Sequence, residues 1–158
     1  MEGVNPKVSR TLLDDGTLAP EHDPGLSWDE LRFVYRHMVE TRLLDERLTA
    51  LQRQGRVGFH VGCLGEEAAI LGSAFAMRPQ DWIFPCYREF GAALMRGLPF
   101  QSFIDNMFGN DNDVVRGRQM PDHYTSRHLP AAHDVVVVAE QMPAGVVIRH
   151  LPAGAPIG

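Results

Sequence analysis

Apolar residues recur at helical spacing over the stretch that follows Ser27. Seven of them form one stripe, which consists of Leu31, Val34, Tyr35, Met38, Leu44, Leu48 and Leu51. Ser27 and Glu30 form a capping box, in which each side chain accepts a hydrogen bond from the other residue's backbone N–H. The pattern therefore predicts one long amphipathic helix that begins after Ser27 and that Gly55 closes. A break near Thr41 is an alternative, because the apolar stripe is interrupted there.

A second helix is predicted after residue 65. Glu66-Glu67 suits its first turn, since acidic side chains interact favourably with the positive end of a helix, and Arg78-Pro79 ends it. Small side chains along this helix would let another helix or a sheet pack closely against it. These small residues are Ala68, Ala69, Gly72, Ala74 and Ala76.

A third, shorter helix is predicted between Pro99 and Gly109. Proline is well placed as a first helical residue, and glycine is a common helix end. The predicted buried face consists of four apolar residues at helical spacing, namely Phe103, Ile104, Met107 and Phe108.

Between these two helices, a short apolar run is followed by a helical pattern. Trp82-Ile83-Phe84 has the length and composition of a buried strand, and Pro85 ends it. The period becomes helical from Glu89 on, so Tyr87 and Arg88 lie at a strand-to-helix junction. Free backbone N–H groups at such a junction favour an anion, and an arginine adds a planar fork for phosphate. In the alternative interpretation, Tyr87 is a half-buried aromatic residue and Arg88 is a surface residue paired with Glu89.

The two ends of the chain differ in character from the middle. Residues 1–26 combine prolines, glycines and charges with few apolar residues, which predicts an extended arm. The end of the chain contains two apolar runs, at 135–138 and 146–148, which predict two strands. Met142-Pro143-Ala144-Gly145 between them predicts a turn. We expect this hairpin to pack poorly against the preceding helices.

Composition and charge narrow the class of protein. With 158 residues, 44% hydrophobic and 22% charged, the chain resembles an ordinary globular domain. A net charge of -5 argues against an extended surface for nucleic acid or for an anionic membrane. The apolar runs are shorter than the roughly 20 residues of a membrane helix, and no signal-peptide pattern is visible. Cys63 and Cys86 form no Cys-x-x-Cys pair, so we expect reduced thiols in a cytoplasmic protein.

Two loops carry candidate chemistry. Residues 55–65 are rich in glycine, as a close backbone approach to a ligand requires, but their spacing matches neither a Walker loop nor the dinucleotide fingerprint. We interpret His60 as an ordinary polar loop histidine, and a histidine that faces a cofactor is the alternative. Residues 110–127 form a polar loop of a length that is usually functional or disordered. Three of the histidines recur at intervals of five residues, on no common face, which disfavours a zinc site: His123, His128 and His133.

Four segments occur in a fixed order along residues 27–128. They are Leu44-Asp45-Glu46-Arg47 with Leu51-Gln52-Arg53-Gln54-Gly55, Gly65-Glu66-Glu67-Ala68, Tyr87-Arg88-Glu89, and Gly117-Arg118-Gln119-Met120-Pro121 followed by His123-Tyr124. Together they resemble the alpha subunit of the thiamine-diphosphate-dependent 2-oxoacid dehydrogenases, the first component of those complexes. The Gly-Glu-Glu and Gly-Arg-Gln-Met-Pro segments are more similar to the branched-chain enzyme than to the pyruvate enzyme.

This resemblance implies an α/β fold, as the truncated N-terminal part of a thiamine-diphosphate-binding fold that is mostly helical with a few short strands. It implies an arm at 1–26, a partial cofactor-binding domain at 27–128 and a divergent tail at 129–158. Tyr87 and Arg88 match the family's tyrosine and arginine that contact thiamine diphosphate, chiefly its diphosphate. Val61 stands where the pyruvate-type relatives carry a histidine, so that histidine's role is not transferred to His60 beside it.

The family's later motifs do not follow in this sequence. The Ser-Ser-Pro segment with Thr-Gln is missing at its usual spacing after Tyr124, and the Gly-Asp-Gly … Asn-Asn motif for magnesium and diphosphate is absent. Magnesium needs such hard oxygen ligands. We therefore expect an N-terminal piece of the family protein, or a product that diverges near residue 129.

The resemblance also implies a reaction, which is oxidative decarboxylation of a 2-oxoacid on thiamine diphosphate with transfer of the acyl group to lipoyl. The implied partners are a beta subunit in an α2β2 assembly and a lipoyl acyltransferase. The residues offer no general base or nucleophile, and we expect this chain alone to be inactive. The alternatives are an inactive remnant or docking fragment, a small independent anion-binding domain, and a fragment of a pyruvate or acetoin dehydrogenase alpha subunit.

Overall fold

The computed structural model describes residues 11–19, 23–79, 81–126 and 146–148. The chain falls into two units, Met1–Phe33 and Val34–Gly158, which are described separately. In the first unit, residues 11–19 of the predicted arm form a local turn. Leu12 and Leu18 form an antiparallel bridge, and the Asp15 carboxylate accepts hydrogen bonds from the Thr17 N–H at 2.9 Å and hydroxyl at 2.6 Å.

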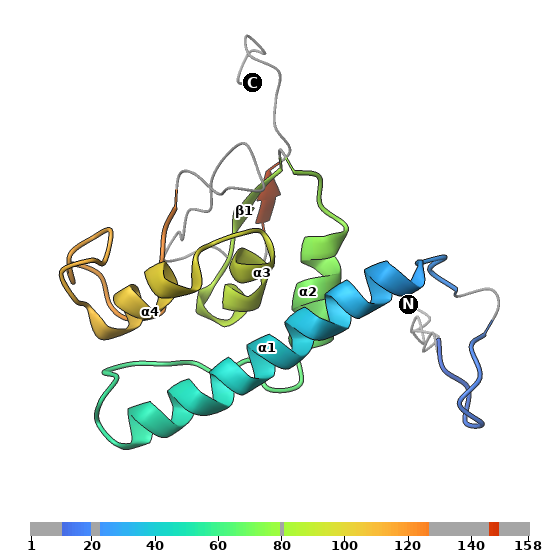
Figure 1. Cartoon of the computed structure of the whole chain (residues 1–158), viewed down its shortest axis with the longest axis horizontal. Helices are drawn as coiled ribbons and strands as arrows, with labels where there is room; N and C mark the ends of the chain where they lie inside the picture. The colour runs from blue at the N-terminus through green and yellow to red at the C-terminus, as the bar shows by residue number, and fades with distance from the viewer. Residues whose placement is uncertain (1–10, 20–22, 80, 127–145, 149–158) are drawn as a thin grey trace, which may run out of the picture. The chain divides into compact units, whose positions relative to one another are not determined.

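Helix α1 (Trp28–Arg53) confirms the long helix predicted from the apolar stripe. The capping box is present, since the Ser27 N–H donates to Glu30 Oε2 at 2.8 Å and the Glu30 N–H donates to Ser27 Oγ at 3.3 Å. The helix has no break at Thr41, which is buried within it (Figure 1). The predicted stripe is too long, because Leu31 and Tyr35 are 41% and 66% exposed. Periodicity identifies one face of a helix but not how far the core extends along it.

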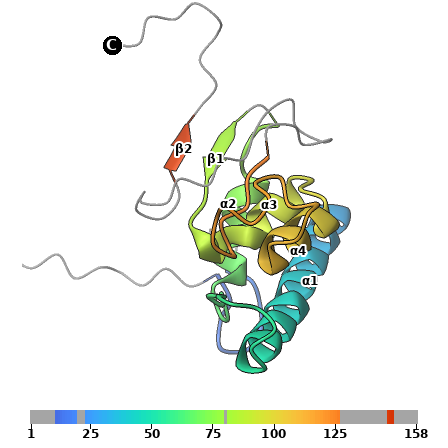
Figure 2. The ribbon, with the colours of Figure 1, turned by 90° about the vertical axis from the view of Figure 1, so that its left-hand side faces the viewer.

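The remaining elements are helices with one pair of short strands. In chain order they are α2 (Glu67–Phe75), β1 (Trp82–Phe84), the 3₁₀ turn η2 (Tyr87–Glu89), α3 (Phe90–Met95), α4 (Phe100–Phe108) and β2 (Val146–Ile148). Strand β2 pairs antiparallel with β1, so that Ile83 lies opposite Val147 (Figure 2). Both strands were predicted, whereas the strand at 135–138 and the turn at 142–145 lie outside the described residues. The described part of the chain is thus mostly helical.

The strand-to-helix junction differs from its prediction in one respect. Tyr87 and Arg88 lie in the 3₁₀ turn η2, and the helix that follows has six residues. Such a short helix aligns few peptide dipoles, so an anion site at this point depends on the Arg88 side chain.

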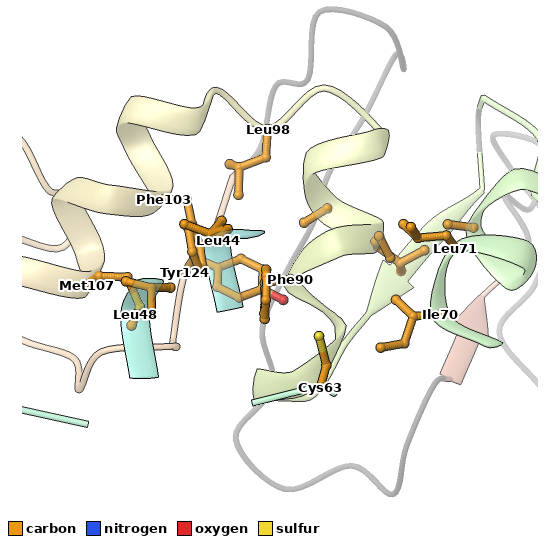
Figure 3. Close-up of a cluster of buried hydrophobic side chains, with 14 of the residues drawn as sticks. Leu44, Leu48, Cys63, Ile70, Leu71, Phe90, Leu98, Phe103, Met107 and Tyr124 are labelled. Atoms are coloured by element: carbon orange, nitrogen blue, oxygen red, sulfur yellow. The ribbon is translucent and has the colours of Figure 1, made fainter. Parts of the chain in front are cut away.

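Aromatic side chains from separate segments meet in the core of the second unit (Figure 3). Phe90 of α3 stacks on Phe103 of α4 with ring centroids 5.3 Å apart, and Phe103 meets the ring of Tyr124 edge-on at 5.2 Å. Tyr124 belongs to the long loop after α4 and is 1% exposed, so this loop contributes to the core. Phe103 and Met107 are buried as predicted, but Phe108 is 42% exposed.

Helix α3 comes close to Thr41 of α1 at Gly91. A Cβ atom at Gly91 would lie 2.6 Å from Oγ1 of the buried Thr41 on α1. Gly72 of α2, by contrast, has nothing within 4 Å of such an atom and is exposed. Glycine is therefore required on α3, where it lets this helix lie against α1.

We expect Gly91→Ala to lower the free energy of unfolding by about 1–3 kcal/mol, because the added methyl group overpacks the contact with Thr41. Gly72→Ala is the matched control. It lies in a helix with open space around it, and should stabilise the protein by roughly 0.5–1 kcal/mol. Urea unfolding of the full chain measures both. Equal effects of the two substitutions would contradict the close approach.

Candidate functional site

The glycine-rich loop, residues 55–65, runs from α1 to α2 and passes directly over Asp45. The Cys63 N–H donates to Asp45 Oδ2 at 3.2 Å. A Cβ atom at Gly62 would lie 2.9 Å from Asp45 Oδ1, closer than real Cβ atoms come. The loop backbone thus makes a close approach at Gly62 to a carboxylate of the protein itself, whereas the predicted approach to a ligand stays a prediction.

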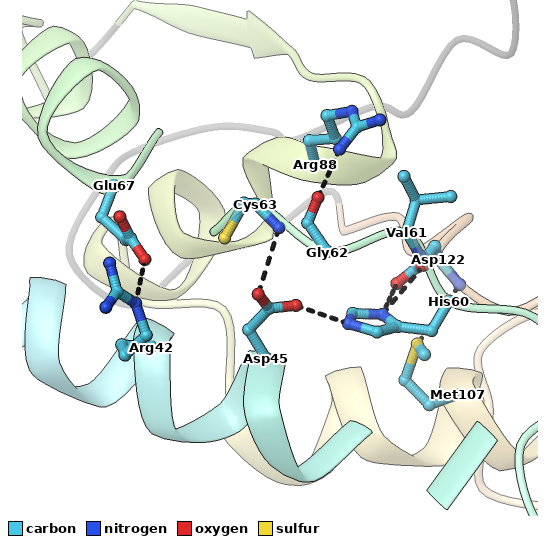
Figure 4. A network of polar contacts seen from close by, with 10 residues as sticks. All are labelled: Arg42, Asp45, His60, Val61, Gly62, Cys63, Glu67, Arg88, Met107 and Asp122. Carbon is cyan, nitrogen blue, oxygen red and sulfur yellow. Dashed lines mark hydrogen bonds and ion pairs between the residues drawn. The ribbon is translucent and has the colours of Figure 1, made fainter. Parts of the chain in front are cut away.

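His60 lies between two carboxylates, and these three residues are called the His60 cluster below (Figure 4). Its Nε2 is 2.7 Å from Asp45 Oδ1, and its Nδ1 is 3.1 Å from Asp122 Oδ2. The three side chains are 0 to 5% exposed. The interpretation of His60 as an ordinary polar loop histidine is therefore wrong, because the ring is buried and bonded on both sides.

Asp122 brings the loop after α4 to the glycine-rich loop. Its Oδ2 also accepts a hydrogen bond from the Val61 N–H at 2.8 Å, and its own N–H donates to Met107 Sδ at 3.3 Å. Its φ of 65° lies in the left-handed region, which aspartate and asparagine tolerate better than most residues. The polar loop predicted from sequence is therefore held by specific contacts around Asp122.

Arg88 reaches the glycine-rich loop from the turn η2. Its guanidinium donates to the Gly62 carbonyl, while the side chain stays exposed (Figure 4). It lines a cavity of about 420 Å³, together with Arg53, Asp45 and Glu46. Tyr87 is 39% exposed and meets the ring of Phe59 edge-on, with centroids 6.1 Å apart. The structure thus places Arg88 at a cavity, bonded to the loop rather than to Glu89.

The far end of the same loop is held by an ion pair between α1 and α2. Arg42 bonds to the buried carboxylate of Glu67, and the Gly65 N–H donates to Glu67 Oε2 at 3.0 Å. The hydrogen bond from Arg42 is the main reason why the pKa of Glu67 lies below its ordinary value.

Neither cysteine has the properties of a nucleophile. Burial, with the nearby charges of Asp45 and Glu67, raises the pKa of Cys63 to about 12. Burial also raises the pKa of Cys86. Neither cysteine forms a disulfide, and both thiols are protonated at neutral pH.

A second, larger hollow of about 500 Å³ lies between α1 and the segment from α3 to α4. Its walls are chiefly apolar side chains, including Leu43, Leu94, Leu98 and Phe100. Neither Tyr87 nor Arg88 lines it. Of the two cavities, the smaller one is therefore the one that Arg88 lines.

The roles of Asp45, Asp122 and Arg53 were not predicted from the sequence. A signal for Asp45 was present, since it lies four residues after Thr41 and three before Leu48, on the buried face of α1. A carboxylate on that face needs a buried partner. Asp122 gave no such signal, because its partner His60 lies 62 residues away along the chain.

The Arg42–Glu67 pair predicts a pH dependence of stability. Because the folded pKa of Glu67 is lowered, its contribution is present above the ordinary pKa of 4.5 and is lost as pH falls through the folded value. We expect Glu67→Gln to abolish this part of the acid destabilisation, whereas Glu66→Gln, at the exposed neighbouring position, should leave it unchanged. Urea midpoints measured from neutral pH down to about 3 test this. Identical pH profiles for Glu67→Gln and the parent chain would contradict it.

No helix in the described part of the chain is long and apolar enough to cross a membrane. The family model that matches the sequence is that of the dehydrogenase E1 component, over residues 35–152. This confirms the resemblance seen in the four ordered segments.

Several curated relatives are alpha subunits of 2-oxoisovalerate dehydrogenase. Mitochondrial subunit alpha 2 of Arabidopsis thaliana is 47% identical over 96 residues, which are 61% of this chain and 20% of that protein. The Pseudomonas aeruginosa subunit is 38% identical over 118 residues, 75% of this chain and 29% of the relative. The mitochondrial subunit of Mus musculus is 40% identical over 105 residues, which are 66% of this chain and 24% of that protein.

The chain thus spans between a fifth and three tenths of the length of these relatives. The family model, however, matches well over half of the chain itself. On that basis, the chain belongs to the dehydrogenase E1 component family.

Proposed function

We propose that this chain is part of the alpha subunit of a branched-chain 2-oxoacid dehydrogenase, and that it forms one side of a thiamine diphosphate site. The family supports dependence on this cofactor, and the similar proteins named above support the branched-chain class. The mostly helical described residues would then be the N-terminal part of an α/β thiamine-diphosphate-binding fold.

The observation that carries this proposal is the position of Arg88. A guanidinium has five N–H donors in a planar fork, so one that is anchored at a carbonyl still has donors for an anion. The Gly62 carbonyl provides this anchor, and Arg53 from the end of α1 lines the same cavity. Two guanidinium groups at one cavity can form charge-assisted, bidentate hydrogen bonds to the phosphates of a diphosphate.

Two carboxylates at this cavity bear on whether it can hold a diphosphate. Asp45 and Glu46 also line it, and each would repel a diphosphate. Asp45, however, already has partners within the protein, since its Oδ1 lies 2.7 Å from His60 Nε2 and its Oδ2 accepts a hydrogen bond from the Cys63 N–H. In this proposal Arg88 is the main contact for the diphosphate at the cavity. Tyr87 does not line the cavity, and its role as a second contact rests on the resemblance of the Tyr87-Arg88-Glu89 segment.

When bound, thiamine diphosphate supplies the carbanion chemistry of decarboxylation. The described residues would bind and orient its diphosphate end. For magnesium, the described residues contain no group of three histidine, cysteine, aspartate or glutamate side chains that could hold the ion. We therefore place its ligands outside this part of the chain.

The proposed partners are a beta subunit in an α2β2 assembly and a lipoyl acyltransferase. The similar proteins are each named as a subunit alpha, which supports a second kind of subunit. In this proposal the beta subunit completes the cofactor site, and the acyltransferase receives the acyl group derived from a branched-chain 2-oxoacid.

We expect the full chain alone to bind thiamine diphosphate and magnesium more weakly than micromolar, and to turn over no 2-oxoacid. One charge-assisted hydrogen bond is worth about 1.5–3 kcal/mol, whereas micromolar binding requires roughly 8 kcal/mol. Arg88→Ala should weaken binding further, and Arg88→Lys should restore only part of it, because lysine lacks the planar fork. Titration calorimetry measures the affinities.

Arg36→Ala is the matched control, since Arg36 is an exposed arginine of α1 that pairs with Glu40. It should leave cofactor binding unchanged. Adding a beta subunit should tighten binding by the parent chain. Tight magnesium-dependent binding by the lone chain that persists in Arg88→Ala would overturn the assignment of Arg88. Failure to bind cofactor even with a beta subunit would favour the inactive remnant.

A further inference from the structure

The His60 cluster has a hydrogen-bonding requirement that a neutral histidine does not meet. A carboxylate oxygen lies within hydrogen-bond distance of each ring nitrogen, and both carboxylates can only accept when ionised. A neutral imidazole carries one N–H, so one of its two contacts would place a lone pair against a lone pair. An imidazolium carries two N–H groups and satisfies both contacts.

The position of the extra proton follows from the other partners of the two carboxylates. Asp122 also accepts the Val61 N–H, and Asp45 also accepts the Cys63 N–H. These contacts use each carboxylate as an acceptor. An imidazolium between the two carboxylates would then satisfy every contact in the cluster.

We propose that protonation of His60 holds the glycine-rich loop in place, and that loss of this proton releases the loop from α1 and from the loop that carries Asp122. Four consecutive residues of the loop, 60–63, are bound through this cluster or beside it. The ring and two N–H groups bind the carboxylates, and the Gly62 carbonyl binds Arg88. A deprotonated ring would leave two buried carboxylates near each other with one N–H between them.

The groups around the ring come from four segments. Asp45 faces it from α1 and Asp122 from the loop after α4, while Phe90 of α3 lies against it with ring centroids 5.9 Å apart. Cys63 on the same loop and Tyr124 near Asp122 are both neutral at physiological pH, since burial raises the pKa of each. The charged partners of the ring are therefore the two carboxylates.

The direction of the pH dependence follows from these surroundings. Burial lowers the pKa of His60, but the hydrogen bonds and charges of Asp122 and Asp45 together outweigh it, and the pKa lies above its ordinary 6.5. The stability that the cluster contributes is then complete below pH 6.5 and is lost as pH rises through the folded pKa. This inference does not depend on the proposed cofactor, because no ligand takes part in it.

The test uses the full chain without any ligand. Nitrogen-15 NMR of the histidine rings across a pH series reports how many ring nitrogens carry a proton, and His60→Gln assigns the His60 signals among the seven histidines. Hydrogen exchange of the amides at 60–63, relative to those of α4, reports loop opening. We expect both His60 nitrogens to be protonated at pH 6.5. We also expect relative exchange to rise about tenfold or more across the His60 midpoint, as the loss of one charge-assisted hydrogen bond would produce.

Asp122→Asn is the decisive variant, because asparagine tolerates the left-handed backbone and its amide oxygen can still accept the Val61 N–H. Its NH₂ group would face Nδ1 and favour a neutral ring. The His60 midpoint and the exchange transition should then fall together to lower pH. His37→Gln, eight residues before Asp45 on α1, should change neither. The proposal is overturned if His60 carries a single ring proton at pH 6.5, or if the exchange transition stays in place while the midpoint moves.

Discussion

The contact on which the site depends is the one between His60 and the two aspartates that flank it. It joins α1, the glycine-rich loop and the loop after α4, which are far apart in sequence. Through it the loop is fixed over Asp45, and the Gly62 carbonyl is presented to Arg88. The position of the arginine at the cavity thus follows from a charge arrangement on the other side of the loop.

Charged contacts hold this loop at two points, and Val57 and Cys63 anchor it in the hydrophobic core. Its middle is held by the His60 cluster, and its far end by the Arg42–Glu67 pair with the Gly65 N–H. Buried charges are tolerated only when paired and hydrogen-bonded, and each carboxylate here has a cationic or N–H partner. The glycine at position 62 follows from the same arrangement, because any larger residue would displace Asp45.

Local signals predicted the parts of the fold that depend on local interactions. The capping box at Ser27 and the 3.6-residue period identified α1, and the apolar run before Pro85 identified β1. Tyr87 and Arg88 were singled out from the change of period, although the helix after them proved short. The His60 cluster was not predicted, because it forms only when Asp122 lies beside His60. No local pattern connects two residues that are 62 positions apart. An aspartate on the buried face of α1 was the one available signal that such a partner existed.

The same cluster also bears on what the cavity can bind. Arg53 and Arg88 contribute two positive charges to its wall, and Asp45 and Glu46 contribute two negative ones, so the cavity considered alone does not favour an anion. An imidazolium bonded to Asp45 changes this balance, because it offsets one of the two carboxylates from behind the wall. If the proposed diphosphate site is correct, both the anchored Arg88 and a protonated His60 contribute to it. The proposed site would then depend on the folded loop as a whole, and not on the arginine motif alone.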